Sequence, residues 1–167
     1  MAERRTVEAA RRKKELGEAP STQAGEFVRE EMHHIREGKH GARSTKQAIA
    51  IGLSKARRAG VELPPPAKGT VPEETRRGAE RDAEVGRRRG TTSVSARRSR
   101  ATTRALKAEG HSAASTPALA RQARTTAKKR GATARSAAAR KAARTRASVA
   151  SGRRKRAQSA AKRTRRA

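Results

Sequence analysis

The pattern of apolar and polar residues predicts two short helices with matching apolar stripes between residues 24 and 60. In both helices the apolar positions recur at i, i+4 and i+7, which places them on one helical face. The intervening positions are mostly charged or polar. The stripes consist of Val28, Met32 and Ile35 in the first helix and of Ile49, Leu53 and Ala56 in the second.

Residues that start and stop helices lie at the expected places around these stripes. Gly38 follows the first helix, and a short loop then leads to Ser44. Ser44 with Gln47 three residues later forms the S-x-x-Q pattern of a capping box, which begins a helix. Gly60 stands where a left-handed residue ends a helix, and a run of prolines soon after it prevents continuation. The sequence therefore predicts a helical hairpin with a small core.

The rest of the chain divides around this hairpin by composition. The predicted fold is mostly α with extensive disorder, in which a small hairpin head precedes a disordered cationic tail. Residues 96–131 are compatible with a second, weaker helical hairpin. The predicted segments are a charged helix (1–17), the hairpin (21–63), a linker with one or two helical turns near Glu73–Glu84 (64–95), the second hairpin (96–131) and a disordered Lys/Arg/Ala-rich tail (132–167).

Punctuation residues outline the second hairpin as they do the first. Its first helix is expected to stop at Gly110. Thr116 is expected to cap the next helix, with Pro117 at the first helical position. This helix should run to Arg130, with Gly131 as its stop.

Composition limits how much of the chain can fold around a core. Val, Ile, Leu and Phe together supply only 16 of 167 residues. This share, about 10%, lies well below the roughly 20% under which a highly charged chain tends to be disordered. Most of the remaining apolar residues are alanines, which bury little area. A single large globular domain is therefore excluded.

The net charge of +29 is divided very unevenly along the chain. Residues 1–84 carry 18 Lys and Arg against 14 acids, whereas residues 85–167 carry 26 Lys and Arg against the single acid Glu109. The second half cannot neutralise itself, so its charges need external anions. Nucleic acid is the abundant polyanion that fits.

Other classes of function find little support in the residues. No Cys is present, Asp82 is the sole Asp, and no His lies near a nucleophile in an apolar setting, so no enzyme and no cofactor are predicted. The segment from Glu30 to His40 contains the E-x-x-H pattern twice, but the second helix offers no facing carboxylates. Pairing at i, i+4 explains these residues more simply, and no metal site is predicted.

The candidate nucleic-acid contacts are basic residues of the hairpin and of the tail. The loop from Gly38 to Gln47 could hold a phosphate at a helix N-terminus, or it could be a plain turn with solvated charges. With Phe27 as the sole aromatic residue, stacking on bases is disfavoured and contacts to the phosphate backbone remain. The candidates are Lys39, Arg43, Lys46, Lys55, Arg57, Arg58, Lys128, Lys129, Arg130, Arg140, Lys141, Arg144, Arg153, Arg154, Lys155, Arg156, Lys162, Arg163, Arg165 and Arg166.

Two segments resemble known proteins. Ser21–Pro66 resembles a bacterial family of small basic proteins of unknown function, through Met32-His33-x-Ile35-Arg36-x-Gly38, the run Ser44–Ser54 and the ending Ala56–Gly60. The resemblance implies a bacterial, intracellular protein but no activity or site residues. Gly131–Ala167 is similar in composition to the linker-histone-like tails of bacterial DNA-coating proteins.

These observations favour a sequence-nonspecific DNA-binding protein of the nucleoid type, located in the cytoplasm at the nucleoid. An alternative is a protein-interaction module in which the hairpin at 24–60 docks a partner through Phe27, Ile49 and Leu53, while the tail localises it. Association with RNA or the ribosome is a third hypothesis. A membrane partner is not expected, because no apolar face accompanies the charge. The oligomeric state stays open.

Overall fold

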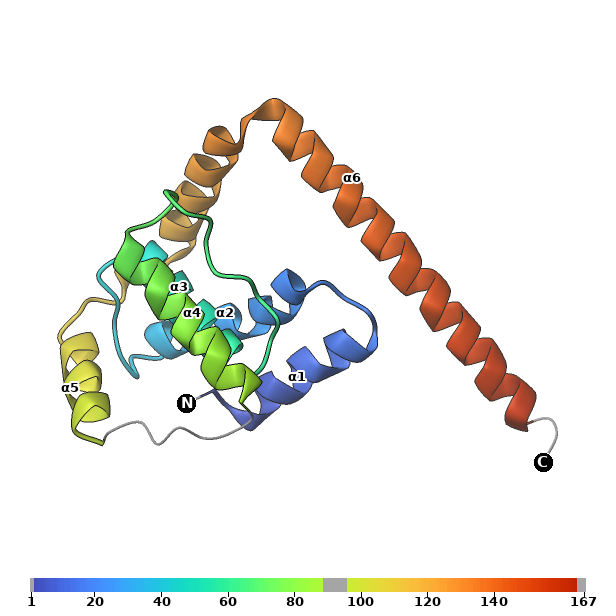
Figure 1. Cartoon of the computed structure of the whole chain (residues 1–167), viewed down its shortest axis with the longest axis horizontal. Helices are drawn as coiled ribbons and strands as arrows, with labels where there is room; N and C mark the ends of the chain where they lie inside the picture. The colour runs from blue at the N-terminus through green and yellow to red at the C-terminus, as the bar shows by residue number, and fades with distance from the viewer. Residues whose placement is uncertain (1, 89–95, 165–167) are drawn as a thin grey trace.

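The chain forms helices at most of the positions that the apolar pattern predicts. The computed structural model describes residues 2–88 and 96–164, with side chains as far as Gly152 except at positions 96 and 98. Within these residues every regular element is a helix, so the prediction of a mostly α fold is confirmed. The elements in chain order are α1 (Arg4–Glu15), α2 (Pro20–Arg36), α3 (Thr45–Arg58), α4 (Glu73–Arg87), α5 (Ala96–Lys107), the 3-10 helix η1 (Ser112–Ala114) and α6 (Thr116–Thr164) (Figure 1).

The ends of α2 and α3 follow the sequence closely. Gly38 and Gly60 have φ values of 74° and 86°, a left-handed conformation that favours glycine. After α3 the Val61 amide donates to the Ala56 carbonyl at 3.1 Å, and the Gly60 amide donates to that of Arg57 at 3.0 Å. This is the Schellman pattern, which satisfies two of the last carbonyls of the helix. The predicted stops at both glycines are confirmed.

The start of α2 corrects the sequence analysis. The helix begins at Pro20, four residues before the expected Ala24. Proline at the first helical position loses nothing, since the amide that it lacks has no partner in a first turn. Residues 20–23, which precede the expected start, therefore form the first turn of α2.

Two small apolar clusters form the core, and α2 contributes to both. The two large side chains Phe27 and Ile35 are 0% exposed, and the space around them is filled mostly by alanine. One cluster contains Met32, Ile35, Ala42, Ala48, Ala113 and Ala114, and the other contains Ala10, Ala24, Phe27, Ala56 and Val61.

A glycine lets α2 and α3 approach closely enough for such small side chains to fill the gap. A Cβ added to Gly52 would lie 2.7 Å from the Val28 Cα, closer than atoms can approach. The two backbones therefore touch at Gly52, and an alanine-rich core becomes sufficient.

The segment expected to be a linker contains a full helix that packs on α3. Helix α4 covers Glu73–Arg87 rather than one or two turns, and it packs on α3. The contact between α3 and α4 is polar near Asp82. The Asp82 carboxylate accepts from Ser54 Oγ and from Arg58 Nε, each at 2.6 Å. These long-range bonds give α4 a partner that local sequence patterns could not reveal.

The second hairpin does not form as expected. In the described residues α5 has no contact with α6, because α5 has little apolar surface to bury. Instead the turn between them packs on the head, which comprises residues 2–88. In this turn η1 contacts α2 and α3 of the head, and it also contacts α6. The N-cap is also one residue earlier than predicted: Ser115 Oγ accepts from the Ala118 amide at 3.3 Å. Pro117 accordingly follows Thr116 within the first turn.

Helix α6 bends sharply at Gly131, whose φ of 70° and ψ of 167° are not helical. The predicted stop at this glycine is therefore confirmed as a kink between two helical parts. Helix α6 contacts only α3 and η1 among the described elements, and Figure 1 shows the part after the kink leaning away from the head. The structure has residues 132–164 as helix, whereas the sequence predicted a disordered tail at 132–167. The state of this tail in the free chain stays a prediction.

Candidate nucleic-acid interface

Several basic side chains of the head are occupied by carboxylates of the head. Lys55 Nζ lies 2.7 Å from Glu31 Oε2 and 3.2 Å from Glu30 Oε1. Arg58 is bonded to Asp82, and Lys39 is within ion-pair distance of Glu37 and Glu3. The bond to Glu37 is the main reason that the pKa of Lys39 is raised. Three candidate contacts of the sequence analysis are therefore already paired within the chain.

Arg57 has a structural role in this fold. It is 6% exposed, and its guanidinium donates to the carbonyls of Leu63 and Pro64 at 3.3 and 3.1 Å. Burial lowers the pKa of Arg57, against the opposing effect of Asp82. A guanidinium that holds the chain after α3 in this way is not available to a phosphate, so we do not carry Arg57 into the interface.

The loop from Gly38 to Gln47 uses its backbone amides for internal bonds. The Gly41 amide donates to Leu106 at 2.8 Å, and the Ala42 amide donates to Gly110 at 3.0 Å. A Cβ on Gly41 would lie 1.9 Å from the Glu109 carbonyl oxygen, so the turn after α5 sits directly on this loop. These contacts favour the structural turn over the phosphate cradle.

The predicted cap at the end of this loop is present in a modified form. The Gln47 amide donates to Ser44 Oγ at 3.2 Å, and Gln47 Oε1 accepts from the Arg43 amide at 2.8 Å rather than from that of Ser44. The side chains of Arg43 and Lys46 are exposed and have no ion-pair partner among the described residues. They remain the two candidate contacts that the hairpin itself presents to solvent.

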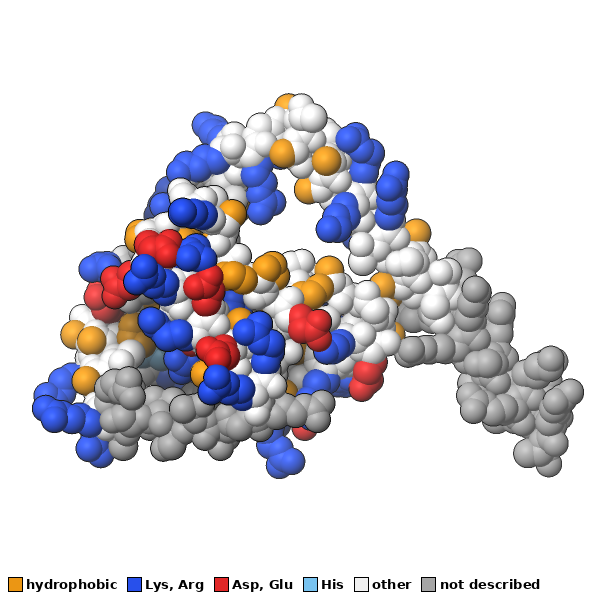
Figure 2. Space-filling view, in the orientation of Figure 1, with side chains coloured by type: hydrophobic (Ala, Val, Ile, Leu, Met, Phe, Trp, Pro, Cys, Tyr) orange, Lys and Arg blue, Asp and Glu red, His pale blue; other side chains and the backbone are white. Residues whose placement is uncertain are grey.

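Helix α6 presents basic side chains of a different kind. Those described in this helix are exposed, and none forms an ion pair with another described residue. Figure 2 shows Lys and Arg on both parts of α6 without acids among them, whereas acidic and basic side chains mix over the head. The candidates placed here are Lys128, Lys129, Arg130, Arg140, Lys141 and Arg144.

The same exposed surface includes basic residues that the sequence analysis left out. Dense clusters stand out in the sequence, whereas isolated basic residues one or two turns apart are equally without ion pairs in the structure, although Arg135 donates to the Ala127 carbonyl at 2.9 Å. The signal that could have found them is the absence of acids after Glu109. These residues are Arg121, Arg124, Arg135 and Arg146 in α6, with Arg97, Arg100, Arg104 and Lys107 in α5.

The remaining candidates lie at the end of the chain. The backbone of α6 extends to Thr164, but the side chains beyond Gly152 are not described, and Arg165 and Arg166 lie outside the described residues. The predicted contacts in this group are Arg153, Arg154, Lys155, Arg156, Lys162 and Arg163.

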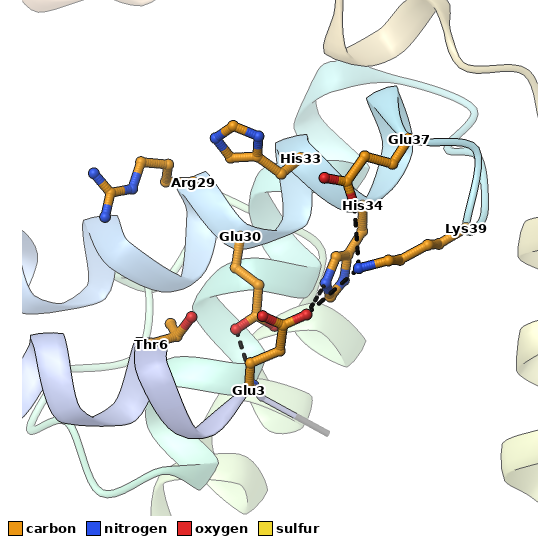
Figure 3. Close-up of a pocket in the computed structure, with 8 residues that line it drawn as sticks. All are labelled: Glu3, Thr6, Arg29, Glu30, His33, His34, Glu37 and Lys39. Carbon is orange, nitrogen blue, oxygen red and sulfur yellow. Dashed lines mark hydrogen bonds and ion pairs between the residues drawn. The ribbon is translucent and has the colours of Figure 1, made fainter.

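A cavity of about 280 Å³ opens between the start of α1 and the end of α2. Figure 3 shows Glu3 reaching toward the His34 ring and Lys39, and Glu3 Oε1 is 2.8 Å from His34 Nε2. This bond is the main cause of the lowered pKa of Glu3. Burial raises the pKa of Glu30, but bonds from Thr6, the Glu3 amide and Lys55 outweigh it and the pKa is lowered. The cavity is therefore lined by carboxylates, and the bonds that Glu3 forms there join the start of α1 to α2.

Potential metal ligands come together beside this cavity. One donor atom each of Glu31, His34 and His40 lies within 4.8 Å of the other two. The E-x-x-H pair of Glu31 and His34 is visible in the sequence, but α3 has no carboxylate to complete it. The third donor comes from the loop instead, where no local pattern marks it.

No helix in the described part of the chain has an apolar stretch long enough to cross a bilayer.

Comparison with known proteins is informative for the head. No curated protein and no solved structure matches the chain. Residues 2–68 match the model of a family of unknown function, DUF6496, which confirms that the hairpin resembles a family of unknown function and extends the match to α1.

Proposed function

We propose that this protein binds duplex DNA through its phosphates, without reading the base sequence, and that α6 supplies most of the contacts. The observation that carries the proposal is that the basic side chains described in α6 are exposed and lack ion-pair partners among the described residues. Free cations of this density release counterions from DNA when they bind, which is the main source of nonspecific affinity.

The distribution of charge around α6 supports binding without a preferred face. At 100° per residue, the basic positions after the kink point in different directions around the helix axis. No apolar stripe accompanies them, so the helix lacks the surface that membrane binding requires. A helix with charge on all sides can lie along a phosphate backbone in many registers. The basic positions described in this part are Arg135, Arg140, Lys141, Arg144 and Arg146.

The alternative of a protein-docking hairpin has less support, because one of its three residues is buried in the core. Phe27 is 0% exposed, and Ile49 and Leu53 pack against the two core clusters while staying partly exposed. Much of their apolar surface therefore stabilises the head. Binding to DNA would place the protein at the nucleoid, and binding to structured RNA is the outcome that would replace this proposal.

The test removes equal charge from α6 and from α1, whose arginines are also exposed. Binding to a duplex of about 20 base pairs is measured by fluorescence anisotropy at 0.1 M salt. The variant of α6 should bind at least about tenfold more weakly, and the control within about threefold of the unaltered chain. The two variants carry four substitutions to Gln, at Arg140, Lys141, Arg144 and Arg146 or at Arg4, Arg5, Arg11 and Arg12.

Two further arms make the result specific. A second duplex of unrelated sequence should bind within about threefold of the first, since phosphate contacts carry no sequence information. A structured RNA is added as a competitor at equal nucleotide concentration. Equal losses in the two variants, strong preference between duplexes, or displacement by RNA at far lower concentration than by DNA would contradict the proposal.

A further inference from the structure

The group formed by Glu31, His34 and His40 has the composition of a transition-metal site. Glu31 and His34 are three positions apart in α2 and lie on the same side of the helix. His40 returns to them from the loop that follows Gly38. We propose that these three residues bind one divalent transition-metal ion, for which Zn²⁺ is the best fit. The proposal is separate from nucleic-acid binding and uses none of the residues of α6.

The strongest observation is the state of the Glu31 carboxylate. The side chain is 0% exposed, and among the described residues no group donates to either oxygen with hydrogen-bond geometry. Lys55 Nζ is 2.7 Å from Oε2 and His40 Nε2 is 3.3 Å from Oε1, so both contacts are close but poorly aligned. A buried carboxylate in this condition is costly unless a cation compensates it. Lys55 compensates one oxygen, and Oε1 remains for a second cation.

The distance between two of the donors already suits a bound ion. Zinc binds imidazole nitrogen at about 2.0–2.1 Å and carboxylate oxygen at similar distances, which places tetrahedral neighbours about 3.3 Å apart. His40 Nε2 and Glu31 Oε1 are separated by 3.3 Å. An ion could therefore occupy the position between them with little movement of either side chain.

His40 also has the second contact that orients a metal-binding histidine. Its Nδ1 lies 3.1 Å from the Gly41 carbonyl oxygen. A carbonyl can only accept, so Nδ1 carries the hydrogen and the lone pair of a neutral ring is on Nε2. Nε2 is the atom that faces Glu31. Hydrogen bonding of the other ring nitrogen to a carbonyl is the usual support of a histidine ligand.

His34 completes the set from the side of the cavity. One of its ring nitrogens is within 4.8 Å of the other two donors, so it needs a shift to reach a common ion. Its ring is held by Glu3, whose Oε1 is 2.8 Å from Nε2, and it lines the cavity seen in Figure 3. His34 is thus the donor through which the group adjoins the cavity, and a binding site needs an entry path of this kind.

The local charge favours a dication. Within and beside the cavity the carboxylates outnumber the amines, because Lys39 and Lys55 face four acids. Arg29 also lines the cavity but is paired with Glu26. Two imidazoles with one carboxylate select zinc and its neighbours over Mg²⁺ and Ca²⁺, which prefer oxygen ligands alone. The four acids are Glu3, Glu30, Glu31 and Glu37.

Binding at this place would join the end of α2 to the following loop. That loop in turn holds the turn after α5 through the amides of Gly41 and Ala42. An ion bound to the folded chain only would raise the unfolding temperature, and the stabilisation would grow with the logarithm of its concentration over its dissociation constant. The proposed site is therefore a structural one that fixes the contact between the head and the turn before α6.

The four histidines of the chain provide a matched test. Zn²⁺ is titrated into the tag-free, full-length protein by isothermal titration calorimetry, and the unfolding temperature is measured with Zn²⁺ and with EDTA. The variant H34Q/H40Q should bind at least about 100-fold more weakly and lose the thermal shift, whereas H33Q/H111Q should bind within about threefold of the unaltered chain. One ion per chain is expected in the unaltered protein. Circular dichroism confirms that each variant is helical.

A second measurement needs no substitution. Diethyl pyrocarbonate labels accessible histidine nitrogens, and mass spectrometry locates the labels with and without Zn²⁺. The ion should protect His34 and His40 and leave His33 and His111 unchanged. Absence of saturable Zn²⁺ binding, equal losses in the two double variants, or equal protection of all four histidines would overturn the proposal.

Discussion

Lysine and arginine side chains serve opposite purposes in the head and in α6. In the head, at residues 2–88, carboxylates are near, and Lys55 and Arg58 are consumed in ion pairs that hold helices together. In α6 no acid is present, and the basic side chains that are described extend into solvent. Whether a lysine or arginine is structural or available for a ligand is therefore decided by the acids that the fold brings to it.

Packing differs between the two regions as clearly as charge does. A Cβ on Gly52 in the head would meet the Val28 Cα at 2.7 Å, whereas a Cβ on Gly152 in α6 would meet nothing within 4 Å. The head is dense at its helix crossing although its side chains are small. The part of α6 after the kink is helical without a packed face. Its helical conformation therefore depends on the intrinsic helix propensity of its residues.

The largest expected effect comes from Gly52→Ala. The added methyl group must push apart the backbones of α2 and α3, so the free energy of unfolding should fall by about 3 kcal/mol. Gly25→Ala, on the exposed side of α2, is the matched control and should be neutral or stabilising by about 0.5–1 kcal/mol. Urea denaturation followed by circular dichroism measures both. A Gly52→Ala protein as stable as the Gly25→Ala protein would show that the two helices do not touch at this position.

Asp82→Ala should have the next largest effect. It removes the acceptor of Ser54 and Arg58 and so releases α4 from α3, at a cost of about 1.5 kcal/mol. Glu84→Ala breaks an exposed pair with Arg88 at the C-cap of the same helix and should cost less than about 0.5 kcal/mol. Equal denaturation midpoints for the two variants would mean that α4 does not depend on the buried contact.

Local signals were enough to predict the central hairpin. Ser44, Gly38 and Gly60 each impose a conformation on the few residues around them, and the structure has all three helix ends where these residues place them. The start of α2 was missed because Pro20 can either break a helix or begin one. Only the packing of the first turn decides between these outcomes.

Contacts between distant residues could not be predicted in the same way. The docking of α4 depends on Asp82 meeting Ser54, 28 positions earlier. The burial of Arg57 depends on carbonyls that follow the helix, and His40 reaches Glu31 only because the loop folds back. Charge composition identified α6 as the exposed basic region, but in the head it could not separate paired cations from free ones. That separation needs the positions of the acids in space.

A smaller effect is expected at the cap of α3. Ser44→Ala removes the acceptor of the Gln47 amide and should lower the free energy of unfolding by about 1 kcal/mol. Ser44→Asp keeps an acceptor at the N-cap and should preserve stability. DNA affinity should be unchanged in both, because the cap belongs to the head and not to the basic surface. A loss of affinity without a loss of stability would instead return the loop to the list of phosphate contacts.

The most direct test of the contrast between head and α6 is the salt dependence of DNA binding in two chains. The full-length protein is compared with a chain that ends at Gly131, which lacks thirteen basic residues but retains the packed start of α6. With about ten phosphates engaged, the logarithm of affinity should fall against the logarithm of salt concentration with a slope near −9. The shortened chain should show a much shallower slope and the same denaturation midpoint of the head. A slope shallower than about −3 in the full-length protein, or the same slope in both chains, would contradict the account.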